Sequence, residues 1–292
     1  TKATMNSGKV RNRGIELQLD GTPVKTKNFT WNSTFTWAKN YNKVLSLAAG
    51  LTDGQTIAYT GGTNCALIAK VGGSIGDIYG YKLKRAPDGQ VVWKDGITAR
   101  TTEFEYVGNA YPAWKAGFSN EFSYKNFRVS ILFDGQWGGI VYSQTHHKMT
   151  EHGTLKHTLK YRENPNFEVV GAGVMLDERG QYVPNNVPIS VSKYYADYWR
   201  RANVETNSFD ASFLKLREAR IEYTIPSAGL NKIGIERLTL ALYGRNLAMW
   251  TKDFPVYDPE VATLNNGTIV PGSEMGQLPS TRTIGFNLTL KF

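Results

Sequence analysis

The last residues of the chain, Thr281–Phe292, read TRTIGFNLTLKF. Hydrophobic and polar residues alternate through this stretch. Because successive side chains of a β-strand point to opposite faces of the sheet, the hydrophobic residues fall on one face. They are Ile284, Phe286, Leu288, Leu290 and Phe292. The pattern predicts a strand with one apolar and one polar face.

The same period of two recurs in six segments upstream. Their apolar positions are Ile15, Leu17 and Leu19; Phe29, Trp31, Phe35 and Trp37; Trp114, Ala116, Phe118 and Phe122; Phe127, Val129, Ile131, Phe133 and Trp137; Ile221, Tyr223 and Ile225; and Leu238, Leu240 and Leu242. The alternation is least regular in Phe213–Ile225. Together the segments predict an all-β fold with seven long strands.

The length of these segments favours a membrane. Most are about eleven residues long, whereas strands of soluble proteins average about 5–6 residues and tilted membrane strands need about 9–11. Their apolar faces carry almost no charge and have aromatic residues near the strand ends, as a lipid-facing band does. A soluble sandwich also shows a period of two, so the alternation alone does not decide.

The connections between the segments also favour a membrane protein. Lys39–Ala113 and Gly138–Ser212 span roughly 75 residues each, which is uncommon in a compact soluble domain, whereas Lys125–Asn126 is a two-residue turn. Short and long connections alternate along the chain, as in bacterial outer-membrane barrels. We therefore expect an antiparallel segment of a transmembrane β-barrel, with periplasmic turns and long extracellular loops. Since seven strands do not close such a barrel, we expect further strands upstream in a longer protein.

Six segments carry a resemblance to a known family. They are KVRNRGIELQL (Lys9–Leu19), GDIYGYKL (Gly76–Leu83), YVGNAYPAWKAGFSNEFSYKNFRVSILFDGQWGG (Tyr106–Gly139), DASFLKLREARIEYTIP (Asp210–Pro226), LTLALYGRNLAMWTKDFPVYDPEV (Leu238–Val261) and LPSTRTIGFNLTLKF (Leu278–Phe292). In this order they resemble the C-terminal part of the SusC/RagA family of TonB-dependent outer-membrane transporters.

The resemblance implies a 22-stranded barrel, of which residues 1–292 would be about the last seven strands. The plug domain and the N-terminal strands would lie outside this chain. A SusD-like surface lipoprotein would cover the barrel, and TonB would act through the absent N-terminal part. The implied function is active import of oligosaccharides or oligopeptides across the bacterial outer membrane, with the C-terminus in the periplasm. A passive outer-membrane porin and a soluble glycan-binding β-sandwich are the alternatives.

Two groups of residues are candidates for binding and assembly. Aromatic residues in or at the base of the long loops could contact substrate or the lipoprotein lid, or could pack within the loops. They are Trp93, Trp137, Tyr142, Trp199, Trp250 and Tyr257. The alternating apolar residues of the last strand resemble a barrel-assembly signal. These are Phe286, Leu288, Leu290 and Phe292.

Polar residues of the sheet and loops give weaker indications. The polar positions Arg128, Asp134, Glu222 and Arg245 would face the lumen and contact the plug or substrate. A turn with the sequence Asp258-Pro259-Glu260 recurs in the family, and we interpret it as a structural hydrogen-bonding centre rather than a metal site. The four histidines fall in one stretch without a metal-binding spacing, so we expect a solvated loop and no metal. They are His146, His147, His152 and His157.

Composition excludes several other classes. The formal net charge is +9, from 34 basic and 25 acidic residues, but the basic residues are spread along the chain, so we expect no nucleic-acid binding. The single cysteine, Cys65, excludes a disulfide scaffold. No nucleophile elbow, phosphate-binding loop or dinucleotide-binding fingerprint occurs. We therefore expect no enzyme activity and no cofactor.

Overall fold

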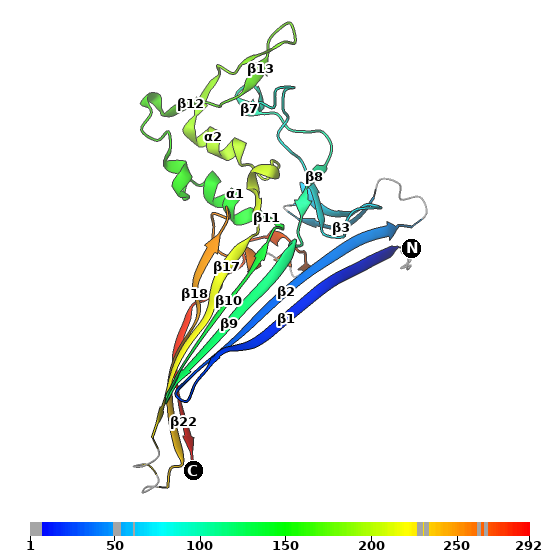
Figure 1. Cartoon of the computed structure of the whole chain (residues 1–292). Coiled ribbons are helices and arrows are strands. Elements are labelled where there is room, and N and C mark those ends of the chain that lie inside the picture. The colour runs from blue at the N-terminus through cyan, green and yellow to red at the C-terminus, as the bar shows by residue number, and fades with distance from the viewer. Residues whose placement is uncertain are drawn as a thin grey trace.

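The computed structural model describes residues 8–48, 54–60, 62–226, 230, 234–261, 264–265 and 268–292. A seven-stranded antiparallel sheet dominates it, with the strands in sequence order (Figure 1). They are β1 (Lys9–Lys25), β2 (Phe29–Ser46), β9 (Trp114–Tyr124), β10 (Phe127–Trp137), β17 (Phe213–Ile225), β18 (Arg237–Thr251) and β22 (Thr283–Lys291). All seven strands expected from the alternation are confirmed.

The first two strands are longer than their apolar pattern. β1 and β2 have 17 and 18 residues and remain paired from Lys9 and Ser46 down to Lys25 and Thr30. The apolar alternation covers only the lower part of this hairpin. In the rest of the hairpin, toward Lys9 and Ser46, neither face is apolar. The hydrophobic pattern therefore disappears there, although the backbone pairing continues. The connection between the two strands is consequently shorter than Gly21–Lys27, the stretch that the apolar pattern alone predicts.

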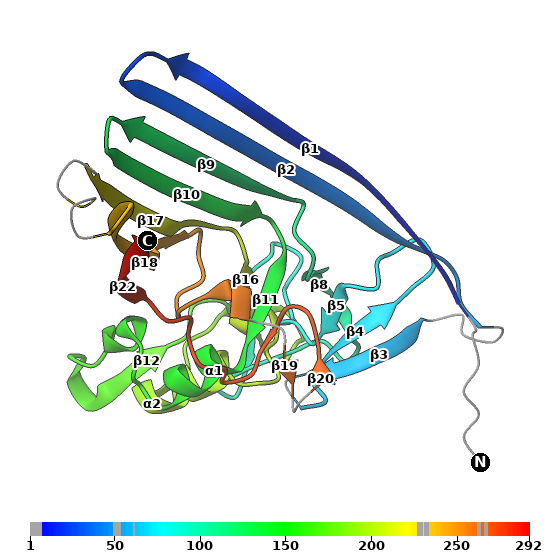
Figure 2. The same cartoon turned by 90° about the horizontal axis from the view of Figure 1, so that it is seen from below.

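The strands form a curved wall. Figure 2 shows the sheet as an arc from β1 to β22, with the elements of the long connections on its concave side. All three long connections leave from one end of the sheet, and the three short ones lie at the other, beside the C-terminus (Figure 1). This is the predicted separation of short turns and long loops. We call these the turn end and the loop end.

The long connections contain short elements of their own, which the sequence patterns did not predict. One four-stranded sheet comprises β3 (Gln55–Thr60), β4 (Cys65–Ala69), β5 (Asp77–Gly80) and β8 (Glu105–Asn109); another comprises β14 (Tyr182–Pro184), β13 (Val174–Leu176), β6 (Val92–Lys94) and β7 (Ile97–Thr98). Smaller sheets pair β16 (Ser208–Asp210), β11 (Ile140–Ser143) and β21 (Ser273–Glu274); β12 (Glu168–Val170) and β15 (Pro188–Ser190); and β19 (Leu264–Asn265) and β20 (Thr268–Ile269).

Helices occur only within these connections in the described part of the chain. They are α1 (Gln144–Glu151), α2 (Val191–Tyr198) and the 3₁₀ turns η1 (Lys156–Leu159), η2 (Pro165–Phe167), η3 (Glu205–Asn207) and η5 (Pro259–Val261). Ser143 and Ser190 cap α1 and α2, each accepting a backbone N–H bond at its hydroxyl. Among the described residues, none of these helices has the length and hydrophobicity that a membrane-spanning helix requires.

The main hydrophobic clusters lie in the loop region rather than on the sheet. The largest consists of Cys65, Leu67, Ile78, Tyr142, Val204 and Val270, and a second of Leu83, Val91, Trp93, Val169 and Ile189. The long connections therefore form a packed unit of their own, which we call the loop unit.

The apolar face of the seven-stranded sheet is uncovered. Ile284 and Phe286 of β22 are 71% and 75% exposed, and Leu242 of β18 is 56% exposed. A β-sandwich requires a second sheet on this face, and none of the described strands provides one. The sandwich alternative is therefore not the architecture observed.

Aromatic residues mark both ends of this apolar face. At the turn end Phe29, Tyr124, Phe127 and Tyr223 stand in register across four neighbouring strands. At the loop end Trp114 and Trp137 are cross-strand partners whose rings stack at 6.3 Å. This arrangement agrees with the aromatic ends predicted for a lipid-facing band.

Candidate functional site

A β-bulge on the polar face creates the densest group of charges in the described residues. The pairing of β17 with both β10 and β18 shifts by one residue at Arg217. A bulge re-aims side chains locally, and here it brings the Arg217 side chain to the polar face beside Asp134. On β18 the irregularity includes Asn246, which has a φ of +50°, a conformation that asparagine tolerates. The bulge also explains the irregular alternation of Phe213–Ile225.

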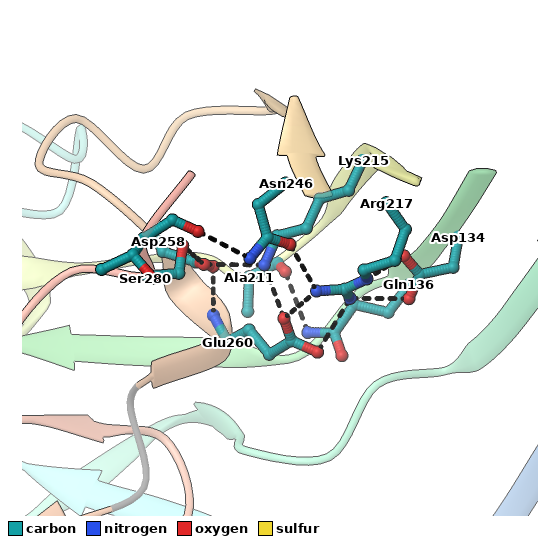
Figure 3. Close-up of polar contacts among 10 residues, drawn as sticks. Asp134, Gln136, Ala211, Lys215, Arg217, Asn246, Asp258, Glu260 and Ser280 are labelled. Atoms are coloured by element: carbon teal, nitrogen blue, oxygen red, sulfur yellow. Dashed lines mark hydrogen bonds and ion pairs between the residues drawn. The ribbon is translucent and has the colours of Figure 1, made fainter. Parts of the chain in front are cut away.

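Arg217 uses all five of its N–H donors (Figure 3). Nε and Nη2 donate to the two oxygens of Asp134 at 2.6 and 2.7 Å. Nη1 and Nη2 donate to Glu260 at 3.0 and 3.1 Å, and Nη1 also donates to Asn246. A guanidinium matches this fork geometry and an ammonium does not. Arg217 thus ties the wall strand β10 to the loop between β18 and β22.

Lys215 makes a second tie to the same loop. Its ammonium donates to Asp258 at 2.7 Å and to Glu260 at 2.5 Å, and the whole residue is 1% exposed. Asp258 also accepts from the Ser280 hydroxyl and from the backbone N–H of Glu260. We call Asp134, Lys215, Arg217, Asp258 and Glu260 the charged junction.

The junction confirms the interpretation of the Asp258-Pro259-Glu260 turn as a structural hydrogen-bonding centre. Burial alone would raise the pKa of Glu260, but the bonds from Arg217 and Lys215 outweigh it and hold this pKa below its usual range. Glu260 is therefore charged at neutral pH, and Asp258 adds the turn's second ion pair, with Lys215. Their role is to hold the β18–β22 loop against the sheet.

A cavity of about 740 Å³ lies beside the junction on the polar face. Its floor is formed by β1, β2, β9 and β10, and the loop residues Tyr111 and Pro259 close it from the side. Glu16, Lys115, Gln136 and Glu260 contribute polar groups. Mixed amide, carboxylate, ammonium and aromatic groups of this kind suit hydrogen bonding to a polar ligand.

A buried carboxylate joins two of the long connections above this cavity. Glu274 of β21 is fully buried and accepts from the hydroxyls of Ser143, Thr145 and Tyr257, at 2.5, 2.7 and 2.7 Å. Two backbone N–H groups, of Thr145 and Gly276, complete its partners. Burial alone would raise the pKa of Glu274, but these donors lower it. Glu274 therefore fixes the start of α1.

The expectation of a solvated histidine loop is wrong for His146 and His147, whereas His152 is exposed. His146 and His147 lie on α1 and are 3% and 5% exposed. The His146 ring stacks on His157 at 5.3 Å, and Nδ1 of His147 lies 2.8 Å from the carbonyl oxygen of Trp199. Burial lowers the pKa of His146 to about 4 and also lowers those of His147 and His157. No group of three or more His, Cys, Asp or Glu side chains in the described residues could hold a metal.

Comparison with known proteins finds relatives of this chain both in sequence and in fold. No family model matches the chain. TonB-dependent receptor P26 of Formosa agariphila is 30% identical over 317 aligned residues, covering 98% of this chain and 30% of that receptor. TonB-dependent receptor SusC of Bacteroides thetaiotaomicron is 26% identical over 151 residues, covering 48% of this chain and 15% of SusC. The solved structure of the RagAB peptide transporter superimposes with a TM-score of 0.66 at 19% identity, over 98% of this chain and 30% of the solved one.

The chain is part of a TonB-dependent receptor of the SusC/RagA family. It spans about 30% of the length of the curated relatives that it matches over nearly its whole length. A second solved structure, of the RagAB peptide importer in the closed-closed state, agrees in fold with a TM-score of 0.65 at 21% identity. Members of the family are transporters rather than enzymes.

Within this SusC/RagA-family segment, the predicted aromatic residues fall into two groups. Trp93 and Tyr142 are buried in the two main hydrophobic clusters, where Trp93 donates its indole N–H to Ala172 and stacks on Tyr194. Their role in this structure is packing, because a buried ring offers no surface to a ligand. Trp137 and Trp250 are 51% and 54% exposed, on the apolar face at the loop end.

Trp199 and Tyr257 are half-buried. Trp199 closes α2 beside the histidine cluster, with its ring 5.1 Å from that of His157. The Tyr257 hydroxyl donates to Glu274. The candidate assembly residues Phe286, Leu288, Leu290 and Phe292 are all exposed on the apolar face.

The predicted lumen-facing residues all lie on the polar face, and each is paired within the wall of this receptor segment. Asp134 binds Arg217, Glu222 binds Arg220, Arg245 binds Glu218, and Arg128 lies 3.7 Å from Glu121. Sequence reasoning missed Lys215, Arg217 and Glu274. The irregular alternation around Arg217 was the available signal for the first two, and nothing in the sequence marked Glu274.

Proposed function

We propose that this chain forms part of the barrel wall and the extracellular loops of a TonB-dependent importer in the bacterial outer membrane. Residues 1–292 would be the C-terminal portion, about the last seven strands of a 22-stranded barrel. The importer would carry oligosaccharides or oligopeptides, with a SusD-like lipoprotein as its lid and TonB acting on the absent N-terminal part. No covalent chemistry is required of this chain.

The uncovered apolar face is the observation that carries this proposal. A sheet in water would bury side chains such as Phe286 and Leu242, since each is worth about 1.5–3 kcal/mol when removed from water. Hydrocarbon accepts them instead, and the aromatic residues at both ends of the face suit the two membrane interfaces. The free edges of β1 and β22 support further strands on either side, because an open edge is not tolerated in lipid.

The polar face supports the import role. Asp134, Glu222 and Arg245 are paired within the wall, and Glu16 and Lys115 add charged groups to the cavity on the same face. The loop unit, fixed by the charged junction and Glu274, overhangs one end of this face. A substrate captured at the loop end would meet the cavity beside Tyr111 and Glu260 on its way inward.

The orientation can be tested by labelling intact cells that express the full-length receptor. Gln181→Cys lies in an exposed turn of the loop unit, and Asn126→Cys lies in the two-residue turn at the other end. The native Cys65 is buried and gives little background. A membrane-impermeant maleimide should label Gln181→Cys on intact cells and Asn126→Cys only after the outer membrane is opened. The reverse pattern would refute the orientation, and equal labelling of both would refute the membrane location.

Transport can be tested with fluorescent oligopeptides and oligosaccharides of increasing size. Uptake that stops when TonB is deleted or the proton gradient is collapsed is the expected result. Uptake that persists in both conditions would indicate the passive porin instead. The class of labelled compound that enters identifies the substrate.

A further inference from the structure

Four cations lie together on the outer side of the wall, directly above its apolar band. In the β1–β2 hairpin, Ile15, Leu17 and Leu19 of β1 share a face with Phe35 and Trp37 of β2. The next positions on the same face toward the loop end are different in kind. They are Arg13 and Arg11 on β1, and Lys39, Tyr41 and Lys43 on β2. We call Arg11, Arg13, Lys39 and Lys43 the basic cluster.

The cluster is uncompensated in the described residues. Arg11 and Lys43 are direct cross-strand partners, and like charges in that position destabilise a sheet. No carboxylate occurs on this face of the hairpin between Lys9 and Gly21 or between Phe29 and Leu45. The two acidic residues of β1, Glu16 and Asp20, are on the polar face. Such an arrangement attracts anions.

The loop unit does not cover the cluster. On the polar face at the same height, Asn12 and Asn42 are bonded to one another, and Asn42 accepts from Ser74 and Ile75 of the loop. The basic side chains point the opposite way. Arg11, Arg13 and Lys43 are exposed, and Lys39 lies 4.8 Å from the centre of the Tyr41 ring, which is itself 55% exposed.

The height of the cluster matches a membrane surface. Ten residues separate Phe29, in the aromatic row at the turn end, from Lys39 on the same strand. At about 3.3 Å per residue this is about 33 Å along the strand. A tilt of about 40° reduces it to about 25 Å, which is the height of the apolar band of an outer-membrane barrel. The cations therefore begin where the hydrocarbon ends, at the level of Trp114 and Trp137.

We propose that the basic cluster binds the phosphate groups of an anionic lipid in the outer leaflet, whose acyl chains lie against Ile15, Leu17 and Trp37. Arginine presents a planar fork that matches phosphate oxygens, and Tyr41 supplies an interfacial aromatic. The neighbouring rows give the acyl chains an uncharged surface. This assignment rests on the proposed membrane location and adds a lipid site to it.

The test uses the full-length receptor in mild detergent, titrated with diphosphorylated lipid A and observed by native mass spectrometry. The test variant is Arg13→Gln/Lys39→Gln/Lys43→Gln. The matched control, Lys25→Gln/Lys27→Gln/Lys125→Gln, removes three charges at the turn end. Because a basic residue near an anionic membrane surface contributes a factor of about five, the test variant should bind lipid A about 100-fold more weakly. The control should bind it as the unmodified receptor does.

Two further arms separate the possible sources of the anion. Dephosphorylated lipid A should bind the unmodified receptor and the test variant equally weakly, and millimolar inorganic phosphate should fail to displace lipid A. Displacement by inorganic phosphate would replace the lipid site by a free-anion site. Equal binding of lipid A by the test variant and the control would overturn the proposal.

Membrane fractionation and import are measured on the same three proteins. All three should fractionate with the outer membrane and import substrate. If the unmodified receptor fractionates with the outer membrane and imports substrate, but the test variant binds lipid A as tightly as it does, only the lipid site is refuted. If the unmodified receptor is absent from the outer membrane, the proposed function fails as well.

Discussion

The ammonium of Lys215 lies 2.7 Å from a carboxylate oxygen of Asp258, and both side chains are 2% exposed. One group belongs to a wall strand and the other to the loop that precedes the last strand. Breaking a buried pair by removing one partner leaves an uncompensated charge, which costs more than the pair itself contributes.

Lys215→Ala takes the cation away from the buried Asp258 carboxylate, so it should lower the free energy of unfolding of the full-length receptor by about 3–5 kcal/mol. Denaturant unfolding in lipid or detergent measures this. Lys291→Ala is the matched control, because it breaks an ion pair with Glu236 in which both side chains are more than half exposed, and it should cost less than about 1 kcal/mol. Similar losses in the two variants would contradict the role of the junction.

Arg217→Lys should be far from conservative. The ammonium keeps the charge but cannot reach Asp134 and Glu260 with paired N–H groups, so we expect a loss of about 1.5–3 kcal/mol. Limited proteolysis should also cleave the β18–β22 loop faster, because Glu260 loses the two guanidinium hydrogen bonds that hold it to the sheet. A double-mutant cycle with Asp134→Asn should show coupling between the two positions. Strict additivity would mean that the fork geometry does not matter.

Acid should loosen the loop unit through its histidines. Burial holds the pKa of His146 at about 4, below the value of about 6.5 for an unfolded chain. The unfolded state therefore binds more protons between these values. Stability is complete above about pH 6.5 and falls toward pH 4, by about 3 kcal/mol for His146 alone.

Hydrogen exchange of α1 between pH 7.5 and pH 4.5 measures this effect. His146→Gln should flatten the profile, whereas His152→Gln, which removes an exposed imidazole, should leave it unchanged. Glu274 acts in the same sense but in a lower pH window, since its lowered pKa means that its contribution is lost only as the pH falls below the pKa of an ordinary glutamate. A flat profile in the unmodified receptor would refute the burial of His146.

Truncation should destabilise the protein much more at Trp93 than at Trp250. Trp93→Ala removes a buried ring and should cost about 3–5 kcal/mol of stability in the loop unit. Trp250→Ala removes a ring that is 54% exposed and should change stability by less than about 1 kcal/mol. Thermal unfolding of the two variants makes the comparison. A large loss for Trp250→Ala would mean that its exposed face is covered in the whole receptor.

Phe292→Ala should reduce the amount of receptor in the outer membrane if the last strand carries an assembly signal. Phe292 is 77% exposed, so a loss of core packing cannot explain such a reduction. Thr289→Ala, on the polar face of the same strand, is the control. Quantitative blotting of outer-membrane fractions gives the readout, and equal levels of the two variants would remove Phe292 from the signal.

The sequence predicts the seven wall strands well because a membrane wall needs one apolar face along its whole height. The same reasoning fails beyond Ile15 and Trp37 toward the loop end, where neither face of the hairpin is apolar and no alternation marks the strands. It also misses α1 and α2, which are eight residues long and owe their stability to packing of His146 and Tyr195 rather than to a long amphipathic pattern.

The charged junction was only half predictable. The Asp258-Pro259-Glu260 turn is visible as a motif, but its partner Lys215 lies 43 residues before Asp258 and 45 residues before Glu260. The bulge at Arg217 left a trace as irregular alternation, but nothing local says which carboxylates a re-aimed guanidinium will meet. The sequence does not reveal exposure either, since Trp93 in a long connection is buried and Trp250 near the end of β18 is exposed.

The charged junction also imposes an order on folding. Lys215 cannot give up its water until Asp258 and Glu260 arrive, and these residues follow β18 in the chain. The loop end of the sheet must therefore stay hydrated while β10, β17 and β18 pair. Water leaves Lys215 only when the β18–β22 loop packs against the sheet. Closure of that loop is thus the step that fixes the loop end of this segment in its final conformation.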